Sequence, residues 1–141
     1  MKLISLYVEN FGVLHSVNFD FRAGLNVFCR ENGAGKTTLA AFLCAMLYGL
    51  GTSRKTDPDE NDRKKYLPWQ GGPFGGSMTF SVRGKTYRAE RYFADGASVR
   101  RDSFVLYDLA DNSVSHDYTE ALGVQLFGID AAAFARSAYL P

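Results

Sequence analysis

A glycine-rich loop between an apolar run and a helix-forming stretch constrains the fold of this chain more than any other feature. The loop consists of Arg30, Glu31, Asn32, Gly33, Ala34, Gly35, Lys36, Thr37 and Thr38. Residues 25–29 before it are apolar, as in a buried strand, and residues 39–48 after it are helix formers that end at Gly49. Strand, glycine loop and helix is the context that a phosphate-binding loop requires. The sequence therefore predicts a nucleotide site at residues 30–38.

The residue types in the loop fit the chemistry of ATP with Mg²⁺. Gly33 and Gly35 let the backbone turn its N–H groups inward around phosphate oxygens, and the helix that we expect to begin near Lys36 adds its positive end. We expect Lys36 to reach the β- and γ-phosphates as a point charge. The hydroxyl of Thr37 is expected to ligate Mg²⁺, and that of Thr38 to donate a hydrogen bond to the α-phosphate.

Arg30 stands where the phosphate-loop pattern has its first glycine, and three readings of this departure stay open. The turn can tolerate a side chain, the loop can be partly mis-set and bind weakly, or Arg30 can add a positive charge near the phosphates. We expect tolerance with some loss of affinity, because the backbone demand at this position concerns geometry rather than chemistry.

The composition is that of an ordinary globular chain. It has 141 residues, 46% of them hydrophobic and 22% charged, which is enough for one domain with a core. The net charge of +1 gives no global field that attracts nucleic acid, so a DNA contact needs a local basic patch.

The longest apolar run is too short to span a bilayer, and the N-terminus lacks a signal-peptide pattern. Cys29 and Cys44 read as core residues in a reduced compartment, so we expect a cytoplasmic protein without a membrane partner.

The rest of the chain alternates between strand and helix patterns. The expected strands are residues 2–9, 15–22, 25–29, 77–82, 86–93 and 103–109, and the expected helices are residues 39–48, 118–126 and 131–138. Residues 51–69 mix charges of both signs and are expected to be solvated and mobile, and the glycine cluster at 71–76 is expected to be a loop. A hairpin region at 76–109 and a helical region at 117–138, with Asp130 as an N-cap, complete the prediction.

Each of two groups of basic residues could have a function or could simply form a solvated polar face. Arg63, Lys64 and Lys65 either touch DNA or form a solvated face, and we favour the solvated face. The second group consists of Arg88, Arg91, Arg100 and Arg101. We expect it to be the polar face and loop of a half-exposed sheet. His15 and His116 lack ligand spacing, so the only expected metal is the Mg²⁺ of the nucleotide.

A catalytic centre is not visible in the sequence. Hydrolysis needs an acidic residue at the end of a further buried strand to hold Mg²⁺, and a group that orients water. The nearest match is Asp108, but Leu109 rather than a second acid follows it, so we interpret Asp108 as a strand-end residue. The sequence predicts no catalytic residue within the chain and a part of a larger ATPase.

Several motifs resemble those of SMC-like ATPases, the superfamily that includes double-strand-break-repair and RecF-type ATPases. The stretches that carry this resemblance are LYVENFG at 6–12, FRAGLNV at 21–27 and NGAGKTTL at 32–39. Those that are similar to the bacterial YhaN-type AAA domain are LPW at 67–69, GGSMTF at 75–80 and LFGID at 126–130.

The resemblance implies an α/β fold, namely the N-terminal lobe of an ABC-ATPase-like P-loop NTPase. This lobe is expected to have an antiparallel β-hairpin region and short C-terminal helices, and to form one partial domain at 1–141. In such heads a long coiled coil separates the two halves of the ATPase, and the stretch matching 134–141 leads to a glutamine that senses Mg²⁺. The C-terminal half carries the signature motif, the Walker B acids and the switch histidine. Two heads dimerise around two ATP molecules, with DNA and a nuclease subunit as further candidate partners.

We therefore expect an ATP- and Mg²⁺-binding lobe of an SMC-like ATPase in DNA repair or chromosome maintenance, with negligible hydrolysis by this chain alone. A degenerate lobe with a structural or assembly role is the alternative that Arg30 supports. A nucleotide-binding domain of an ABC transporter is a third reading, against which stands the long hairpin-rich insertion after Lys36. A small-molecule kinase is the least favoured, because no lid arginines can be read.

Overall fold

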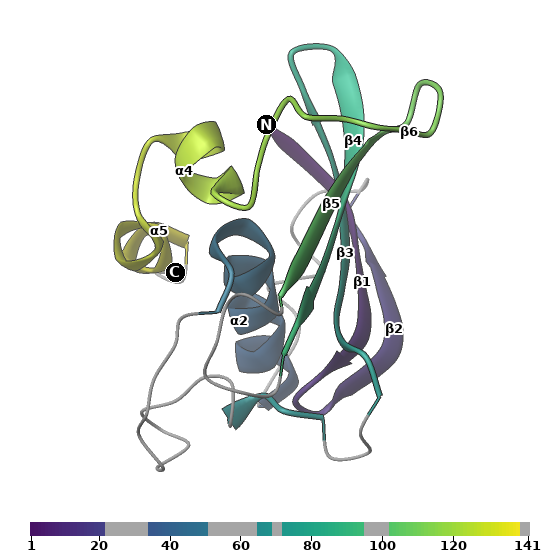
Figure 1. Ribbon diagram of the computed structural model, residues 1–141. Helices are drawn as coiled ribbons and strands as arrows, with labels where there is room; N and C mark the ends of the chain where they lie inside the picture. The colour runs from purple at the N-terminus through teal and green to yellow at the C-terminus, as the bar shows by residue number, and fades with distance from the viewer. Residues whose placement is uncertain (22–33, 51–64, 69–71, 95–101, 139–141) are drawn as a thin grey trace.

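In the part of the chain that the structure describes, a six-stranded antiparallel sheet carries the described helices on one face (Figure 1). The computed structural model describes residues 1–21, 34–50, 65–68, 72–94 and 102–138. The strands are β1 (Lys2–Phe11), β2 (Leu14–Asp20), β3 (Phe74–Val82), β4 (Lys85–Phe93), β5 (Ser103–Asp108) and β6 (Ser113–Val114), and the helices are α2 (Ala34–Tyr48), α4 (Leu122–Phe127) and α5 (Ala131–Ala138). The strand order is β2-β1-β3-β4-β5-β6, and every described pair is antiparallel. The expected strand at 25–29 lies outside the described residues.

Period-two alternation explains why β4 has one buried and one half-exposed face. Tyr87, Ala89, Arg91 and Phe93 are buried, and the residues between them are half-buried. The turn that joins β3 to β4 has positive φ at both central residues, 52° at Arg83 and 81° at Gly84. This is the backbone of a type I′ turn, which matches the twist of the flanking strands. The predicted hairpin is confirmed.

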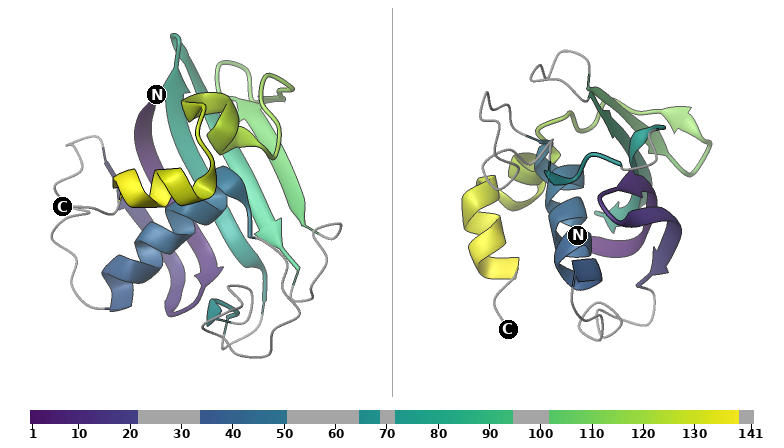
Figure 2. Two further views of the ribbon diagram at one scale, coloured as in Figure 1. Left: turned by 90° about the vertical axis from the view of Figure 1, so that its left-hand side faces the viewer. Right: turned by 90° about the horizontal axis from the view of Figure 1, so that it is seen from below.

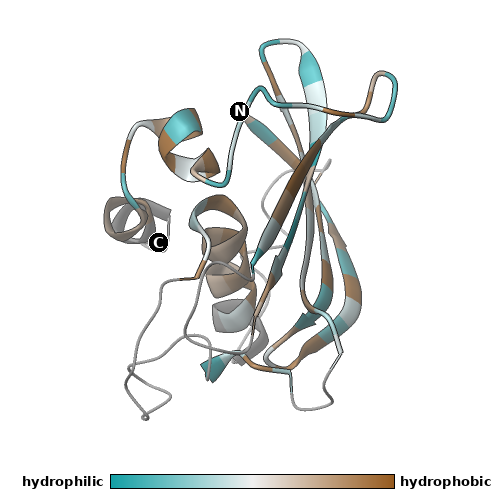
Figure 3. Ribbon diagram, viewed as in Figure 1, coloured by the Kyte–Doolittle hydropathy of each residue, from teal (hydrophilic) through white to brown (hydrophobic). Residues whose placement is uncertain are grey.

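Helix α2 lies between the sheet and the pair α4–α5, so the described part of the molecule has three layers (Figure 2). Hydrophobic residues are frequent in helix α2 and recur at intervals along the strands (Figure 3). The fully buried side chains include Leu6, Phe11, Phe21, Leu39, Phe42, Met46, Leu47, Met78, Phe80, Leu106 and Leu122. Phe11 is central to the aromatic part of this core. Its ring centroid is 5.3 Å from that of Phe42, 4.7 Å from that of Tyr66 and 5.7 Å from that of Phe74.

The prediction that the glycine cluster at 71–76 is entirely a loop is wrong, because β3 already begins at Phe74. Gly75 has φ of 148°, and a side chain there would collide with the main chain of Arg91. A Cβ at Gly76 would collide with the carbonyl oxygen of Tyr7 and stand 3.0 Å from the Phe42 ring. The pairing of β1 with β3 also shifts register beside these glycines. They are therefore strand residues at an irregularity where the neighbouring backbone leaves no room for a side chain.

Three other sequence expectations need correction. The polar segment at 51–69 was expected to be solvated and mobile, but Tyr66 within it is buried and stacks on Phe11. The rest of that segment, at 51–64 and 69, lies outside the described residues. The helix expected at 118–126 begins only at Leu122, because the Tyr118 ring packs near Tyr87 and the Thr119 N–H binds a side chain. The sequence reading also missed β6, whose two residues are too few for a visible alternation.

Helix α5 matches its expected bounds and its expected cap. It spans Ala131–Ala138, and the Oδ1 of Asp130 accepts the backbone N–H of Ala133 at 2.8 Å. An N-cap carboxylate that binds the third N–H of the helix satisfies one of the donors that the first turn leaves unpaired. The prediction of Asp130 as an N-cap is confirmed.

Replacing Gly76 by alanine is expected to destabilise the fold by about 2 kcal/mol or more, since the new methyl group must displace the Tyr7 carbonyl or the Phe42 ring. The measurement is the midpoint of urea unfolding. Ser81→Ala, at a half-buried position of the same strand, is the matched control and is expected to change stability by less than about 0.5 kcal/mol. An unchanged midpoint for Gly76→Ala would contradict this account of β3.

Replacing Tyr87 by phenylalanine is expected to lower Tm by a few degrees at pH 7. The buried phenol donates a hydrogen bond to Oδ2 of Asp117 at 2.6 Å, which ties the segment before α4 to the sheet. This bond, together with Lys85, lowers the pKa of Asp117. A carboxyl group with a lowered pKa stabilises the fold above its unfolded pKa of about 3.9 and loses that effect as pH falls through the folded value.

The difference in Tm between Tyr87→Phe and the parent protein is therefore expected to shrink as pH falls below about 4. Tyr107→Phe, on the opposite face of the adjacent strand, is the control and is expected to show no such pH dependence. A Tyr87→Phe difference that stays constant down to pH 2 would exclude the bond to Asp117 as its cause.

Candidate nucleotide-binding site

Helix α2 begins at Ala34, inside the glycine-rich loop and two residues before the position expected from the sequence. Gly35, Lys36 and Thr37 therefore belong to its first turn. The backbone N–H groups of a first turn have no partner within the helix, and the helix dipole places partial positive charge there. The first turn of α2 contains no acidic residue that would repel an anion. This combination is the one that binds phosphate at helix N-termini.

The N-terminal end of α2 is held against the turn between β1 and β2. Thr38 is buried, and its Cγ2 is 3.3 Å from the place where a side chain of Gly12 would begin. Gly12 has φ of 59° and donates its N–H to the Tyr66 carbonyl at 2.7 Å. The aromatic core below this turn then positions the helix through Phe42. The β1–β2 turn, Tyr66 and the first turns of α2 thus meet at one end of the sheet.

The roles assigned to individual loop residues stay predictions. Arg30, Glu31, Asn32 and Gly33 lie outside the described residues, and so do the side chains of Lys36 and Thr37. The structure describes the side chain of Thr38, which is buried beside Gly12. What the structure adds is the backbone: the part of the loop from Ala34 onward is helical, as phosphate binding at a helix N-terminus requires.

The structure confirms that Asp108 is a strand-end residue. It is the last residue of β5, and its Oδ1 accepts the N–H of Ala110 at 3.0 Å. A carboxylate that binds the backbone two residues ahead stabilises a turn. Within the described residues there is also no group of three His, Cys, Asp or Glu residues that could hold a metal ion.

Two arginines that the sequence grouped together lie on opposite faces of β4. Arg88 is on the outer face, with its guanidinium 4.9 Å from the Tyr107 ring centroid and its Nε 3.4 Å from a Glu90 carboxylate oxygen. Arg91 is on the inner face and is 3% exposed. The prediction of a half-exposed polar face is therefore wrong for Arg91. Arg100 and Arg101 lie outside the described residues, as do Arg63 and Lys64, whereas Lys65 is exposed.

The alternation of β4 contains the signal that could have placed Arg91 correctly. Tyr87, Ala89 and Phe93 share its parity and are apolar, so the period of two puts an arginine at an inner position. Sequence reasoning gave more weight to the charge of the residue than to its position in the pattern. An arginine is rarely buried unless its N–H groups are bound, so its position required a structural explanation.

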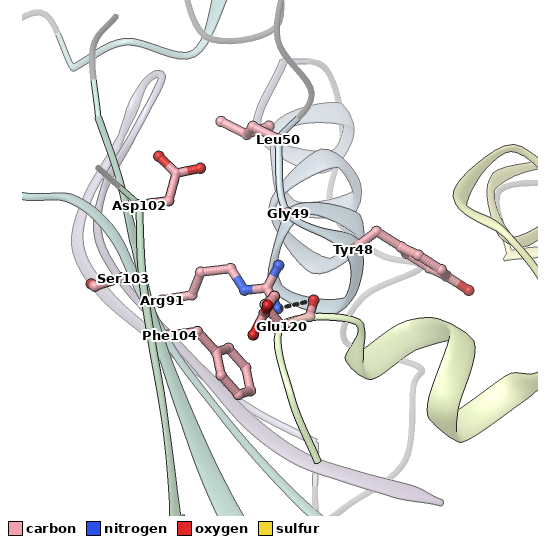
Figure 4. A pocket seen from close by; sticks show the side chains of 8 residues that line it. All are labelled: Tyr48, Gly49, Leu50, Arg91, Asp102, Ser103, Phe104 and Glu120. Carbon is pink, nitrogen blue, oxygen red and sulfur yellow. Dashed lines mark hydrogen bonds between the residues drawn. The ribbon is translucent and has the colours of Figure 1, made fainter. Parts of the chain in front are cut away.

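Arg91 lines a cavity of about 450 Å³ at the C-terminal end of α2 (Figure 4). The lining residues are Tyr48, Gly49, Leu50, Arg91, Asp102, Ser103, Phe104 and Glu120. Burial lowers the pKa of Arg91 to about 10, although the carboxylates of Glu120 and Asp102 act in the opposite direction. Two carboxylates and a helix C-terminus oppose the binding of an anion there. The cavity is also about 22 Å from the first turn of α2, the length of a 15-residue helix, so it is separate from the candidate phosphate site.

Comparison with known proteins agrees with this geometry. The AAA domain family matches residues 5–126. A stretch of 79 residues is 35% identical to the uncharacterized protein YhaN of Bacillus subtilis (strain 168), and it covers 55% of this chain and 7% of that protein. A stretch of 135 residues is 28% identical to the DNA double-strand break repair Rad50 ATPase of Nanoarchaeum equitans (strain Kin4-M), and it covers 92% of this chain and 16% of that protein.

The chain belongs to the AAA domain family. Its sequence resemblance to SMC-like and RecF-type ATPases is confirmed by its similarity to YhaN and to the Rad50 ATPase. Membership of this family implies the use of a nucleotide and Mg²⁺. The chain spans only a small part of the length of both relatives. No helix in the described ranges is long and apolar enough to cross a membrane.

Proposed function

We propose that this chain is the ATP- and Mg²⁺-binding, ABC-ATPase-like N-terminal lobe of an SMC-like ATPase. The observation that carries the proposal is the start of α2 at Ala34, which puts the Gly-Lys-Thr part of the motif on a helix N-terminus. The similarity to a double-strand break repair ATPase supports a role in DNA repair or chromosome maintenance. We place the protein in the cytoplasm.

In the proposed site, backbone N–H groups and three side chains bind different parts of Mg²⁺-ATP. The N–H groups of residues 33–37 surround the phosphates, with Lys36 at the β- and γ-phosphates and the hydroxyl of Thr37 as a ligand of Mg²⁺. Thr38 donates to the α-phosphate, and Arg30, Glu31 and Asn32 belong to the proposed nucleotide-binding loop. Bound Mg²⁺ would neutralise charge on the β- and γ-phosphates.

Hydrolysis is assigned to a composite site rather than to this chain alone. The proposed partner is the C-terminal half of the same ATPase head, which would supply the acidic residues and the signature motif, and two such heads would form a head-to-head dimer. DNA and a nuclease subunit are further proposed partners. The similarity to a DNA double-strand break repair ATPase supports them.

Replacing Lys36 by alanine is expected to weaken ATP binding at least ten-fold, about 1.4 kcal/mol, because the charge that meets the β- and γ-phosphates is lost. Calorimetric titration with Mg²⁺-ATP measures the change directly. In a parallel melting experiment, ATP at 100 times Kd is expected to stabilise the parent protein by about 2.7 kcal/mol.

Lys2→Ala removes an exposed lysine at the start of β1 and serves as the control with unchanged ATP affinity. Equal affinities for the parent protein and Lys36→Ala, or no binding by either, would refute the proposed site. The same preparations are expected to release no phosphate from ATP. Lys36-dependent phosphate release would show that this chain is a complete catalyst, contrary to the proposal.

Replacing Arg30 by glycine is expected to strengthen ATP binding a few-fold, because glycine restores the residue that the tight turn of the motif uses. The measurement is the same titration. Identical affinities would show that the turn tolerates the side chain without loss. Weaker binding by Arg30→Gly would show instead that the arginine adds a favourable charge near the phosphates.

A further inference from the structure

The last turn of α2 is fixed by directional contacts, in addition to apolar packing along its sides. Phe42, Met46 and Leu47 are buried against neighbouring elements, and such contacts are non-directional. At the C-terminal end, the hydroxyl of Tyr48 donates to the Ile129 carbonyl at 2.9 Å. Arg91, which donates to the Glu120 carbonyl, lies against the same end of the helix at Gly49. A hydrogen bond holds its two groups within a narrow range of distance, so contacts of this kind help to set the position of a helix along its axis.

Arg91 joins three parts of the chain at this point. It extends from β4 toward Gly49, and its Nη2 donates to the Glu120 carbonyl at 2.6 Å (Figure 4). Its guanidinium lies 4.8 Å from the Phe104 ring centroid. Its Nη1 is 2.7 Å from the place where a Cβ of Gly49 would stand. Sheet, helix end and the segment before α4 therefore meet at one guanidinium.

Gly49 explains how the guanidinium comes so close to the helix. It ends α2 with φ of 79° and donates its N–H to the Ala45 carbonyl at 2.7 Å, as in a left-handed C-terminal cap. A cation beside a helix C-terminus interacts favourably with the helix dipole. Arg91 thus occupies the space that the absent side chain of Gly49 leaves, in contact with the end of α2.

Stability alone is a weak reason for an arginine at this position. The residue is 3% exposed, and its Nε has no hydrogen-bond partner among the described residues. The free energy lost by taking a charge out of water is only partly recovered through its contacts, so a buried charge is weak evidence of stabilisation. What an arginine provides and an apolar residue lacks is a directional bond at a fixed place.

We propose that Arg91 is a positioning residue of the nucleotide site: it fixes α2 along its axis and so sets where the N–H groups of its first turn meet the phosphates. The inference rests on the proposed function of that first turn. A helix of 15 residues is stiff over its length of about 22 Å, so an axial shift at Gly49 appears at Ala34 as well. N–H···O bonds form within a narrow range of about 2.7–3.2 Å, so a shift of half an ångström weakens several of them together.

The test compares the ATP affinity of Arg91→Met with that of the parent protein. At a temperature where both proteins are fully folded, we expect Kd for Mg²⁺-ATP to rise about five-fold or more, a change that a loss of stability alone would not produce. Arg91→Lys, which retains the charge and one donor, is expected to recover part of the affinity. Arg88→Met, on the outer face of the same strand, is the matched control and is expected to leave Kd unchanged.

Gly49→Ala tests the same contact from the helix, because its methyl group would press on Nη1 of Arg91. It is expected to raise Kd as well, and it becomes the test of the positioning role if Arg91→Met does not fold. Unchanged Kd in the folded variants, with Lys36→Ala still defective, would overturn the positioning role alone. Absence of ATP binding by the parent protein would overturn the proposed function and, with it, this inference.

Discussion

Burial of α2 is the constraint on which the rest of the described structure depends. The helix is apolar on the side that faces the sheet and on the side that faces α4 and α5, so it needs a cover on both. Each fully buried large side chain contributes about 1.5–3 kcal/mol, and Leu39, Phe42, Met46 and Leu47 all belong to this class. The same burial places the Gly-Lys-Thr turn at one end of the sheet. The position of the proposed phosphate site is thus a consequence of how the core is packed.

Features that depend on local sequence could be predicted, and features that depend on distant neighbours could not. The turn at Arg83 and Gly84, the alternation of β4 and the cap at Asp130 need only a few adjacent residues. The strand character of Gly75 and Gly76 comes from the backbone of Tyr7 and Arg91, which no local pattern contains. The delayed start of α4 has the same kind of cause, since the preceding residues bind the sheet.

In the candidate site, too, local features could be predicted and long-range contacts could not. Its loop could be recognised from residue types and their context, although the helix begins two residues earlier than expected. The link between the far end of that helix and Arg91 could not be recognised, because it joins Gly49 to β4 and to Glu120 across the fold. The outer face of the sheet gives little support to DNA binding, since Arg88 is paired with Glu90 and stacked on Tyr107.

The pairing of β1 with β3 has a consequence for how the protein acquires its site. The register joins Asn10 to Gly75, so the glycine-rich loop and all of α2 lie within the segment that this pairing closes. Contacts between residues far apart in sequence form late, because the chain must lose loop entropy before they stabilise it. During synthesis, α2 cannot reach its final position until β3 has left the ribosome. The proposed phosphate site is therefore among the last parts of this fold to form, although its residues are made early.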